Sequence, residues 1–119
     1  MEARKIIITG AATRMGAAIA KKLSGPNIEI VIHYNKSRSK AENLKKDLTK
    51  SGTKMYLAKA DLTKEKEIER MLKFSKSKLK YFDCLINNAS LFENDKIGDF
   101  TTKSWDSHLK ANLKAPALL

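Results

Sequence analysis

The first sixteen residues hold the feature that most constrains the fold, an apolar run that passes directly into a glycine-containing turn. The segment Lys5–Thr9 contains three consecutive isoleucines without polar alternation, which is typical of a strand covered on both faces in a parallel sheet. Gly10 permits a sharp turn, and Gly16 allows the next helix, from Met15 to about Leu23, to lie close against that strand. The free backbone N–H groups at the start of such a helix favour an anion, here a pyrophosphate.

Three later segments have the same strand character and are separated by helical patterns. They are Ile28–Tyr34, Met55–Ala60 and Phe82–Asn87. Strands that alternate with helices are joined by right-handed crossovers into a parallel sheet covered on both faces. The predicted fold class is therefore α/β, a Rossmann-type parallel sheet flanked by helices, with strand order 3-2-1-4 and strand four at an edge. Ligands bind such sheets at the carboxyl ends of strands one and four, where the winding reverses.

Local signals predict where the helices between these strands begin. Ser39 and Glu42 have capping-box spacing at the start of the second helix. Thr63 is suited to cap the third helix, and a last helix is expected from about Thr102.

The composition is that of an ordinary globular domain, with 42% hydrophobic and 31% charged residues. A chain of 119 residues can bury one core, so residues 1–119 are expected to form one domain. The formal net charge of +11 leaves a basic nucleic-acid-binding domain as an alternative function. Because the excess lysines are spread along helical stretches and aromatic residues are few, we favour a solvated surface over a nucleic-acid interface.

Cys84 is the single cysteine of the chain. It lies in an apolar run and cannot form an internal disulfide, so we expect it to be a small buried hydrophobic residue. No apolar run approaches the length of a signal core or of a membrane span. These observations predict a cytoplasmic protein without a membrane partner, and no metal site is expected.

The turn after the first strand resembles a family motif. Thr9, Gly10 and Gly16 match the T-G-x-x-x-G-x-G turn of the short-chain dehydrogenase/reductase family, with Arg14 at the inner glycine. In the more general G-x-G-x-x-G fingerprint, Ala12 stands at the middle glycine. The arginine resembles the pteridine reductase branch, whose T-G-x-x-x-R-x-G turn brings this side chain to cofactor phosphate and substrate.

The end of the second strand bears on which nicotinamide cofactor would be used. A carboxylate at this point accepts hydrogen bonds from a ribose hydroxyl and repels a 2′-phosphate. This chain has donors and cations instead, namely His33, Asn35, Lys36, Ser37 and Arg38. The run from His33 to Ser37 also resembles the H-Y-x-x-S segment that binds this phosphate in the pteridine reductase branch. The expected cofactor is NADP(H), with a merely solvated basic loop as the alternative.

Asp61 and Leu62 follow the third strand, at a point where the family contacts adenine. Without the family, Asp61 would be interpreted as the start of a helix. Together with the loop after strand four, the resemblance implies a set of cofactor-binding residues: Gly10, Arg14, Met15, Gly16, His33, Tyr34, Asn35, Ser37, Arg38, Asp61, Leu62, Asn88, Ala89 and Ser90.

The loop after strand four resembles the N-N-A-G signature of the family, with Ser90 in place of glycine. The pteridine reductase branch has N-N-A-S-x-F here, with the serine beside cofactor and substrate. By this resemblance Phe92 would stack a flat heterocycle against the nicotinamide, and Arg14, Ser90 and Phe92 would contact substrate. An ordinary apolar contact under a loop is the alternative for Phe92.

Asn112 resembles the asparagine of the family's catalytic set, which supports a water on the proton-relay path. The family also uses a downstream Tyr-x-x-x-Lys pair as proton donor. None of Tyr34, Tyr56 and Tyr81 has a lysine four residues on. The resemblance therefore covers the whole chain but only about the first half of a family enzyme.

The resemblance implies an NADP(H)-dependent oxidoreductase that transfers hydride to a C=N or C=O group of a small substrate such as a pterin. This chain would be the cofactor-binding half, without turnover of its own. We expect a homo-oligomer, because strand four is an edge and the last helix carries Trp105 and Leu109. A noncatalytic nucleotide-binding or interaction module remains the alternative on the same fold.

Overall fold

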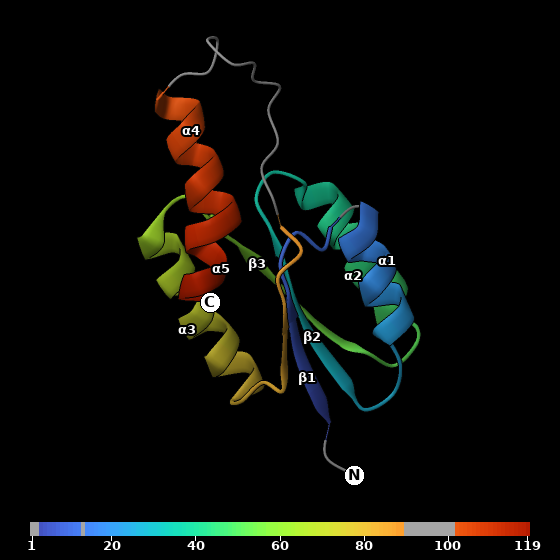
Figure 1. Ribbon diagram of the computed structural model, residues 1–119. Coiled ribbons are helices and arrows are strands. Elements are labelled where there is room, and N and C mark those ends of the chain that lie inside the picture. The colour runs from blue at the N-terminus through green and yellow to red at the C-terminus, as the bar shows by residue number, and fades with distance from the viewer. Residues whose placement is uncertain (1–2, 13, 90–101) are drawn as a thin grey trace.

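The described residues form a four-stranded parallel sheet with helices on both faces (Figure 1). The computed structural model describes residues 3–12, 14–89 and 102–119. The strands are β1 (Arg4–Ile8), β2 (Ile28–Tyr34), β3 (Lys54–Lys59) and β4 (Cys84–Ile86). Their order, β3-β2-β1-β4, confirms the predicted topology. β4 is shorter than the segment that the sequence predicted, because only Cys84–Ile86 pairs with β1.

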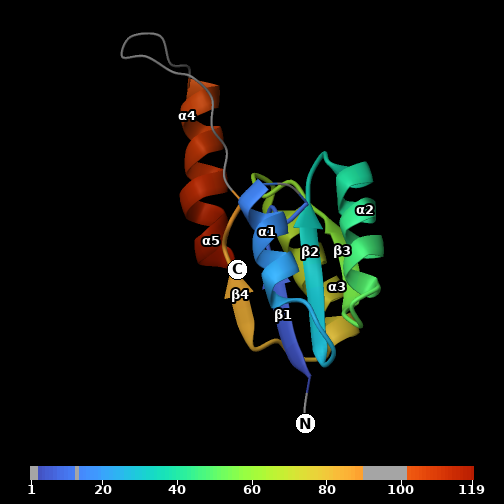
Figure 2. The same cartoon turned by 90° about the vertical axis from the view of Figure 1, so that its right-hand side faces the viewer.

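Five α-helices and one π-helix accompany the strands in the described residues. They are α1 (Arg14–Leu23), α2 (Arg38–Thr49), α3 (Glu65–Leu79), α4 (Thr102–Leu109), the π-helix η1 (Lys110–Lys114) and α5 (Ala115–Leu118). Helices α1 and α2 cover one face of the sheet and α3 covers the other (Figure 2). The last three helical segments follow one another directly, and α5 contacts α3.

The register of the central strands explains why the isoleucine run has no polar alternation. Ile7 pairs with Val31 on one side and with Leu85 on the other. Successive side chains of a strand point to opposite faces, so Ile6 and Ile8 face α1 and α2 while Ile7 faces α3. Each face buries its own apolar cluster, as a parallel sheet with two covered faces requires.

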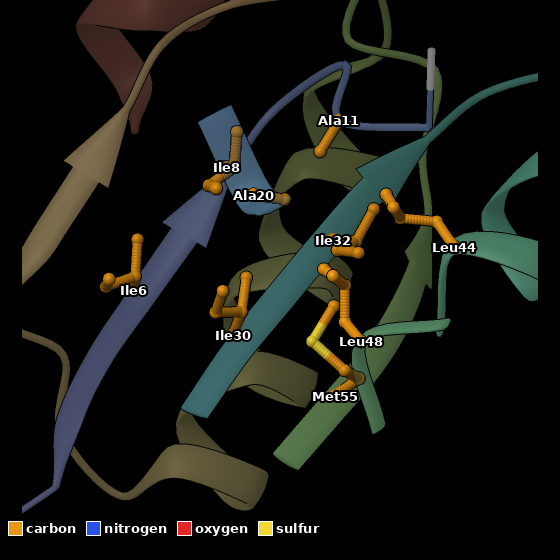
Figure 3. Close-up of a cluster of buried hydrophobic side chains, with 9 residues drawn as sticks. All are labelled: Ile6, Ile8, Ala11, Ala20, Ile30, Ile32, Leu44, Leu48 and Met55. Atoms are coloured by element: carbon orange, nitrogen blue, oxygen red, sulfur yellow. The ribbon is translucent and has the colours of Figure 1, made fainter. Parts of the chain in front are cut away.

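The cluster beneath α1 and α2 is shown in Figure 3. Its buried members come from three strands, two helices and the turn after β1: Ile6, Ile8, Ala11, Ala20, Ile30, Ile32, Leu44, Leu48 and Met55. The opposite cluster packs Ile68, Met71 and Leu79 of α3 against the other face. These contacts fix the helices above the sheet and leave the ends of the strands to form the site.

Two helix starts differ from the sequence prediction. Helix α2 begins at Arg38 with Ser37 as its N-cap, and Glu42 bonds Arg38 rather than closing a capping box with Ser39. Helix α3 begins after Lys64 as N-cap, whereas Thr63 donates its N–H and hydroxyl to Asp61. Both predicted caps were wrong because another polar group nearby provides a competing local hydrogen bond.

The strand β4 lies at an edge of the sheet, as expected. Cys84 is exposed there, which corrects the prediction of a buried cysteine. The prediction failed because an edge strand with one neighbour leaves its outer side open. Among the described residues, no helix is both long enough and apolar enough to cross a membrane.

Candidate nucleotide-binding site

The turn after β1 lies against the loop after β4. Gly10 has a φ of 63°, a left-handed conformation that glycine adopts without steric cost. A Cβ atom at Gly10 would come within 2.9 Å of the Ala89 Cα atom. The missing side chain therefore permits both the turn and the close approach of the two loops.

Gly16, in the first turn of α1, also permits a close approach of backbone segments. A Cβ atom there would lie 2.6 Å from Nδ2 of Asn88 and 2.7 Å from the Ala11 Cα, and it would also collide with the carbonyl oxygen of Gly10. Because these neighbours are mostly backbone, they cannot rotate away. The Asn88 side chain donates to the Gly10 carbonyl at 3.1 Å, so helix, turn and β4 loop meet around Gly16.

Thr9 joins β1 to the β4 loop through its hydroxyl oxygen. This oxygen accepts the backbone N–H groups of Asn88 and Ala89, each at 3.0 Å. The Thr9 side chain is buried, and the backbone N–H of Thr9 donates to the Ile86 carbonyl at 3.0 Å. Sequence reasoning used Thr9 only as a motif match and missed this role, because the partners are 79 and 80 residues away.

His33 lies at the end of β2 with 3% of its surface exposed. Its Nδ1 accepts the N–H of Gly10 at 2.9 Å, and its Nε2 lies 2.7 Å from the carbonyl oxygen of Ala60. A carbonyl oxygen can only accept, so Nε2 carries the proton and the ring is neutral. Burial lowers the pKa of His33, with the hydrogen bond to Ala60 opposing that shift. The expected direct bond from His33 to a 2′-phosphate is therefore corrected, since the protein backbone uses both ring nitrogens.

Arg14 begins α1 in a backbone conformation that suits glycine. Its φ is 54°, which costs a residue with a Cβ atom roughly 1 kcal/mol or more. The side chain is exposed. Glycine would adopt this conformation without steric cost.

A cavity of about 1070 Å³ opens between α1 and α2 at the carboxyl ends of the strands. Figure 2 shows that both helices start at the same end of the sheet, the end to which the arrow of β2 points. The predicted site residues that line the cavity are Gly10, Arg14, Met15, His33, Asn35, Ser37, Asn88 and Ala89. The remaining lining residues are Ala12, Ala17, Lys21, Lys40, Asn43, Leu44 and Asp47. The topology thus brings together most of the turn, β2-end and β4-end residues that the sequence singled out.

The cation supplied by α2 differs from the predicted one. Arg38 does not line the cavity, and its Nε lies 2.9 Å from Oε1 of Glu42. Lys40 lines the cavity instead. Ser37 is the N-cap of α2, and Lys40, three residues later, lies on the same side of the helix. A correct prediction of this N-cap would therefore have identified Lys40.

Asp61 sits in a local turn outside this cavity. Its Oδ1 accepts the Thr63 N–H at 2.9 Å and the Thr63 hydroxyl at 2.7 Å. Burial opposes ionisation, but the bonds from Thr63 and the charges of Lys64 and Lys36 outweigh it and lower the pKa of Asp61. The carboxylate is therefore charged at neutral pH. The cavity is also not lined by Gly16, Tyr34 or Leu62.

The remaining predicted residues divide into two groups. Ser90 and Phe92 lie outside the described residues, as does the side chain of Trp105. Asn112 lies in η1, the π-helical turn between α4 and α5. No group of three His, Cys, Asp or Glu side chains in the described part of the chain could hold a metal ion.

A glycine turn from β1 into α1, beneath a cavity at the carboxyl ends of a doubly wound parallel sheet, defines a Rossmann-type nucleotide-binding domain. Comparison with known proteins gives the family. The chain belongs to the short chain dehydrogenase family, whose sequence model matches residues 4–119.

Two curated relatives illustrate the match. The short-chain dehydrogenase/reductase FrzI of Cladobotryum sp is 30% identical over 95% of this chain and 44% of its own length. The 3-oxoacyl-[acyl-carrier-protein] reductase FabG of Staphylococcus epidermidis is 26% identical over 93% of this chain and 46% of its own length. The chain therefore spans about half the length of the curated relatives it matches.

Solved structures give the same result. The FolM alternative dihydrofolate reductase 1 of Brucella suis, in complex with NADP, is 31% identical with a TM-score of 0.87, over 97% of this chain and 48% of that one. A short chain dehydrogenase of Burkholderia cenocepacia, also in complex with NADP, is 25% identical with a TM-score of 0.93. The match covers 98% of this chain and 48% of that one. The match again covers half of the relative.

Proposed function

We propose that this chain is the NADP(H)-binding half of a short-chain reductase. The observation that carries the proposal is the charge of the cavity between α1 and α2. Three cations line it, Arg14, Lys21 and Lys40, whereas Asp47 is the one carboxylate among the described residues that does so. This cavity also reaches Ser37, the N-cap of α2, whose side chain makes no capping hydrogen bond. Free donors and positive charge at the end of β2 favour a 2′-phosphate over a ribose hydroxyl.

The residues fit a dinucleotide along the whole turn. Gly10, Ala12 and Arg14 of the turn line the cavity, and the start of α1 offers N–H groups and the Arg14 charge to a pyrophosphate. Asn35, Ser37 and Lys40 would bind the 2′-phosphate. Adenine would lie toward Asp61 and Leu62, as the family resemblance implies.

The substrate end is assigned by the family resemblance alone. Asn88, Ala89 and Ser90 would lie beside the nicotinamide, with Arg14, Ser90 and Phe92 contacting substrate and Asn112 supporting a water. When bound, NADPH supplies a hydride for a C=N or C=O group. A pterin-like substrate is part of the proposal because FolM, a dihydrofolate reductase by name, is among the similar structures. We also propose a cytoplasmic location and self-association through the open β4 edge.

Calorimetric titration of the 119-residue chain with NADPH and with NADH tests cofactor binding. NADPH should bind about tenfold more tightly, because one charge-assisted hydrogen bond to the 2′-phosphate is worth about 1.5–3 kcal/mol before screening. Equal affinities would contradict the assignment of the β2 end to this phosphate. Binding to nucleic acid that falls steeply with salt, without nucleotide binding, would instead favour the basic-domain alternative.

The variant Arg14→Gly should separate backbone strain from ligand binding. It removes the left-handed strain, so the melting temperature should stay the same or rise, while NADPH binding should weaken about tenfold through the lost charge. Arg14→Ala is the matched control: it loses the same charge but keeps the strained backbone and should show no gain in stability. If Arg14→Gly bound NADPH as tightly as the wild type, Arg14 would have no part in the site.

A further inference from the structure

The imidazole of His33 connects three strands at the carboxyl edge of the sheet. Its ring lies between the Gly10 N–H after β1, 2.9 Å from Nδ1, and the Ala60 carbonyl after β3, 2.7 Å from Nε2. The backbone carbonyl of His33 also accepts the N–H of Ala11 at 3.1 Å. The turn that would face a pyrophosphate is therefore bonded to His33 at two successive residues.

The two ring bonds require opposite chemistry from the two nitrogens. The Gly10 N–H needs an acceptor at Nδ1, and the Ala60 carbonyl needs a donor at Nε2. Only the neutral tautomer with its proton on Nε2 satisfies both. The other neutral tautomer would set two donors against each other at Gly10 and two acceptors at Ala60, and buried groups left without partners are costly.

We propose that His33 is a positioning residue of the cofactor site, and that its neutral Nε2–H form holds the Gly10 turn in the geometry that receives the dinucleotide. The proposal rests on the proposed NADP(H) function. In this proposal His33 affects dinucleotide binding through the hydrogen bond between its Nδ1 and the Gly10 N–H. The Nε2 bond with Ala60 fixes the tautomer and the ring orientation, as the second nitrogen of a functional histidine commonly does.

Two amide variants separate the two bonds. In His33→Asn the side-chain oxygen takes about the place of Nδ1, so it can accept from Gly10 but cannot reach Ala60. In His33→Gln the amide nitrogen takes about the place of Nε2, so it can donate to Ala60 but leaves the Gly10 N–H without an acceptor. Each variant loses one buried hydrogen bond, so a similar loss of thermal stability is expected in both.

NADPH affinity, measured by calorimetry, should distinguish them. We expect His33→Gln to weaken binding about tenfold and His33→Asn to remain within about threefold of wild type. A merely structural role would weaken both variants in proportion to their lost stability. Equal affinities in the two variants, or weaker binding in His33→Asn, would overturn the proposal.

The tautomer is measured on the wild-type chain, so this test does not depend on whether the variants fold. Nitrogen-15 NMR of the His33 ring at neutral pH should show a protonated Nε2 and an unprotonated Nδ1, without nucleotide present. A proton on Nδ1 would overturn the proposal. If NADPH failed to bind the wild type while the ring showed the Nε2–H form, the proposed cofactor would be wrong and the imidazole bridge itself would stand.

Discussion

Gly16→Ala is expected to destabilise the protein by about 2–4 kcal/mol and to lower its melting temperature by about 10 °C. The added methyl group would lie 2.6 Å from Nδ2 of Asn88 and 2.7 Å from the Ala11 Cα, and would also collide with the Gly10 carbonyl oxygen. Helix α1 would have to move away from the turn. NADPH binding should be lost together with the contact between helix, turn and β4 loop.

Ala18→Ser is the control for this effect, because it adds one heavy atom to an exposed position of the same helix. Its free energy of unfolding should stay within about 0.5 kcal/mol of wild type, and its NADPH affinity should not change. Thermal denaturation followed by circular dichroism measures both variants. Equal melting temperatures for Gly16→Ala and Ala18→Ser would mean that α1 does not approach the Gly10 turn this closely.

Ser37→Asp should reverse the nucleotide preference. The carboxylate would replace a hydroxyl donor at the cavity and repel the 2′-phosphate, so NADPH affinity should fall about 100-fold, the worth of two charge-assisted hydrogen bonds. NADH affinity should change by less than about threefold. Because Ser37 is the N-cap of α2 and aspartate is favourable at that position, the variant should be at least as stable as wild type.

Ser39→Asp adds the same charge to the first turn of the same helix, at an exposed residue that does not line the cavity. Long-range electrostatics alone would weaken NADPH binding comparably in both variants. We expect a change of less than about fivefold for Ser39→Asp in 0.15 M salt, where screening acts over about 8 Å. If the two variants behaved alike, or if Ser37→Asp kept the NADPH preference, Ser37 would not contact the 2′-phosphate.

The order of the sheet and the positions of its strand ends could be predicted because they depend on local patterns. Three isoleucines without alternation required two covered faces, and the strand order followed from the crossover rules. Gly10, Ser37 and Asn88 were therefore expected near one edge of the sheet, and all three line the cavity. This part of the prediction did not need the direction of any side chain.

The direction of each side chain at the carboxyl ends of the strands could not be predicted, because it depends on which nearby group forms a hydrogen bond or ion pair with that side chain. Arg38 does not line the cavity, and it pairs with Glu42 four residues later. Ala60, 27 residues after His33, takes its Nε2. A sequence pattern identifies which donors follow the end of a strand. It does not say which acceptor each donor binds, whether that acceptor is four residues away, as for Arg38, or 27 residues away, as for His33.

The bond between Thr9 and the β4 loop also joins segments that are far apart in the chain. Strands β1, β2 and β3 lie within the first 59 residues and pair with their sequence neighbours. Joining Thr9 to Asn88 closes a loop of about 80 residues, and the entropy of closure grows with loop length. Only three residues of β4 pair with β1 to offset it. Because of this closure cost, we expect the Gly10 turn to meet the β4 loop only after β1, β2 and β3 have paired.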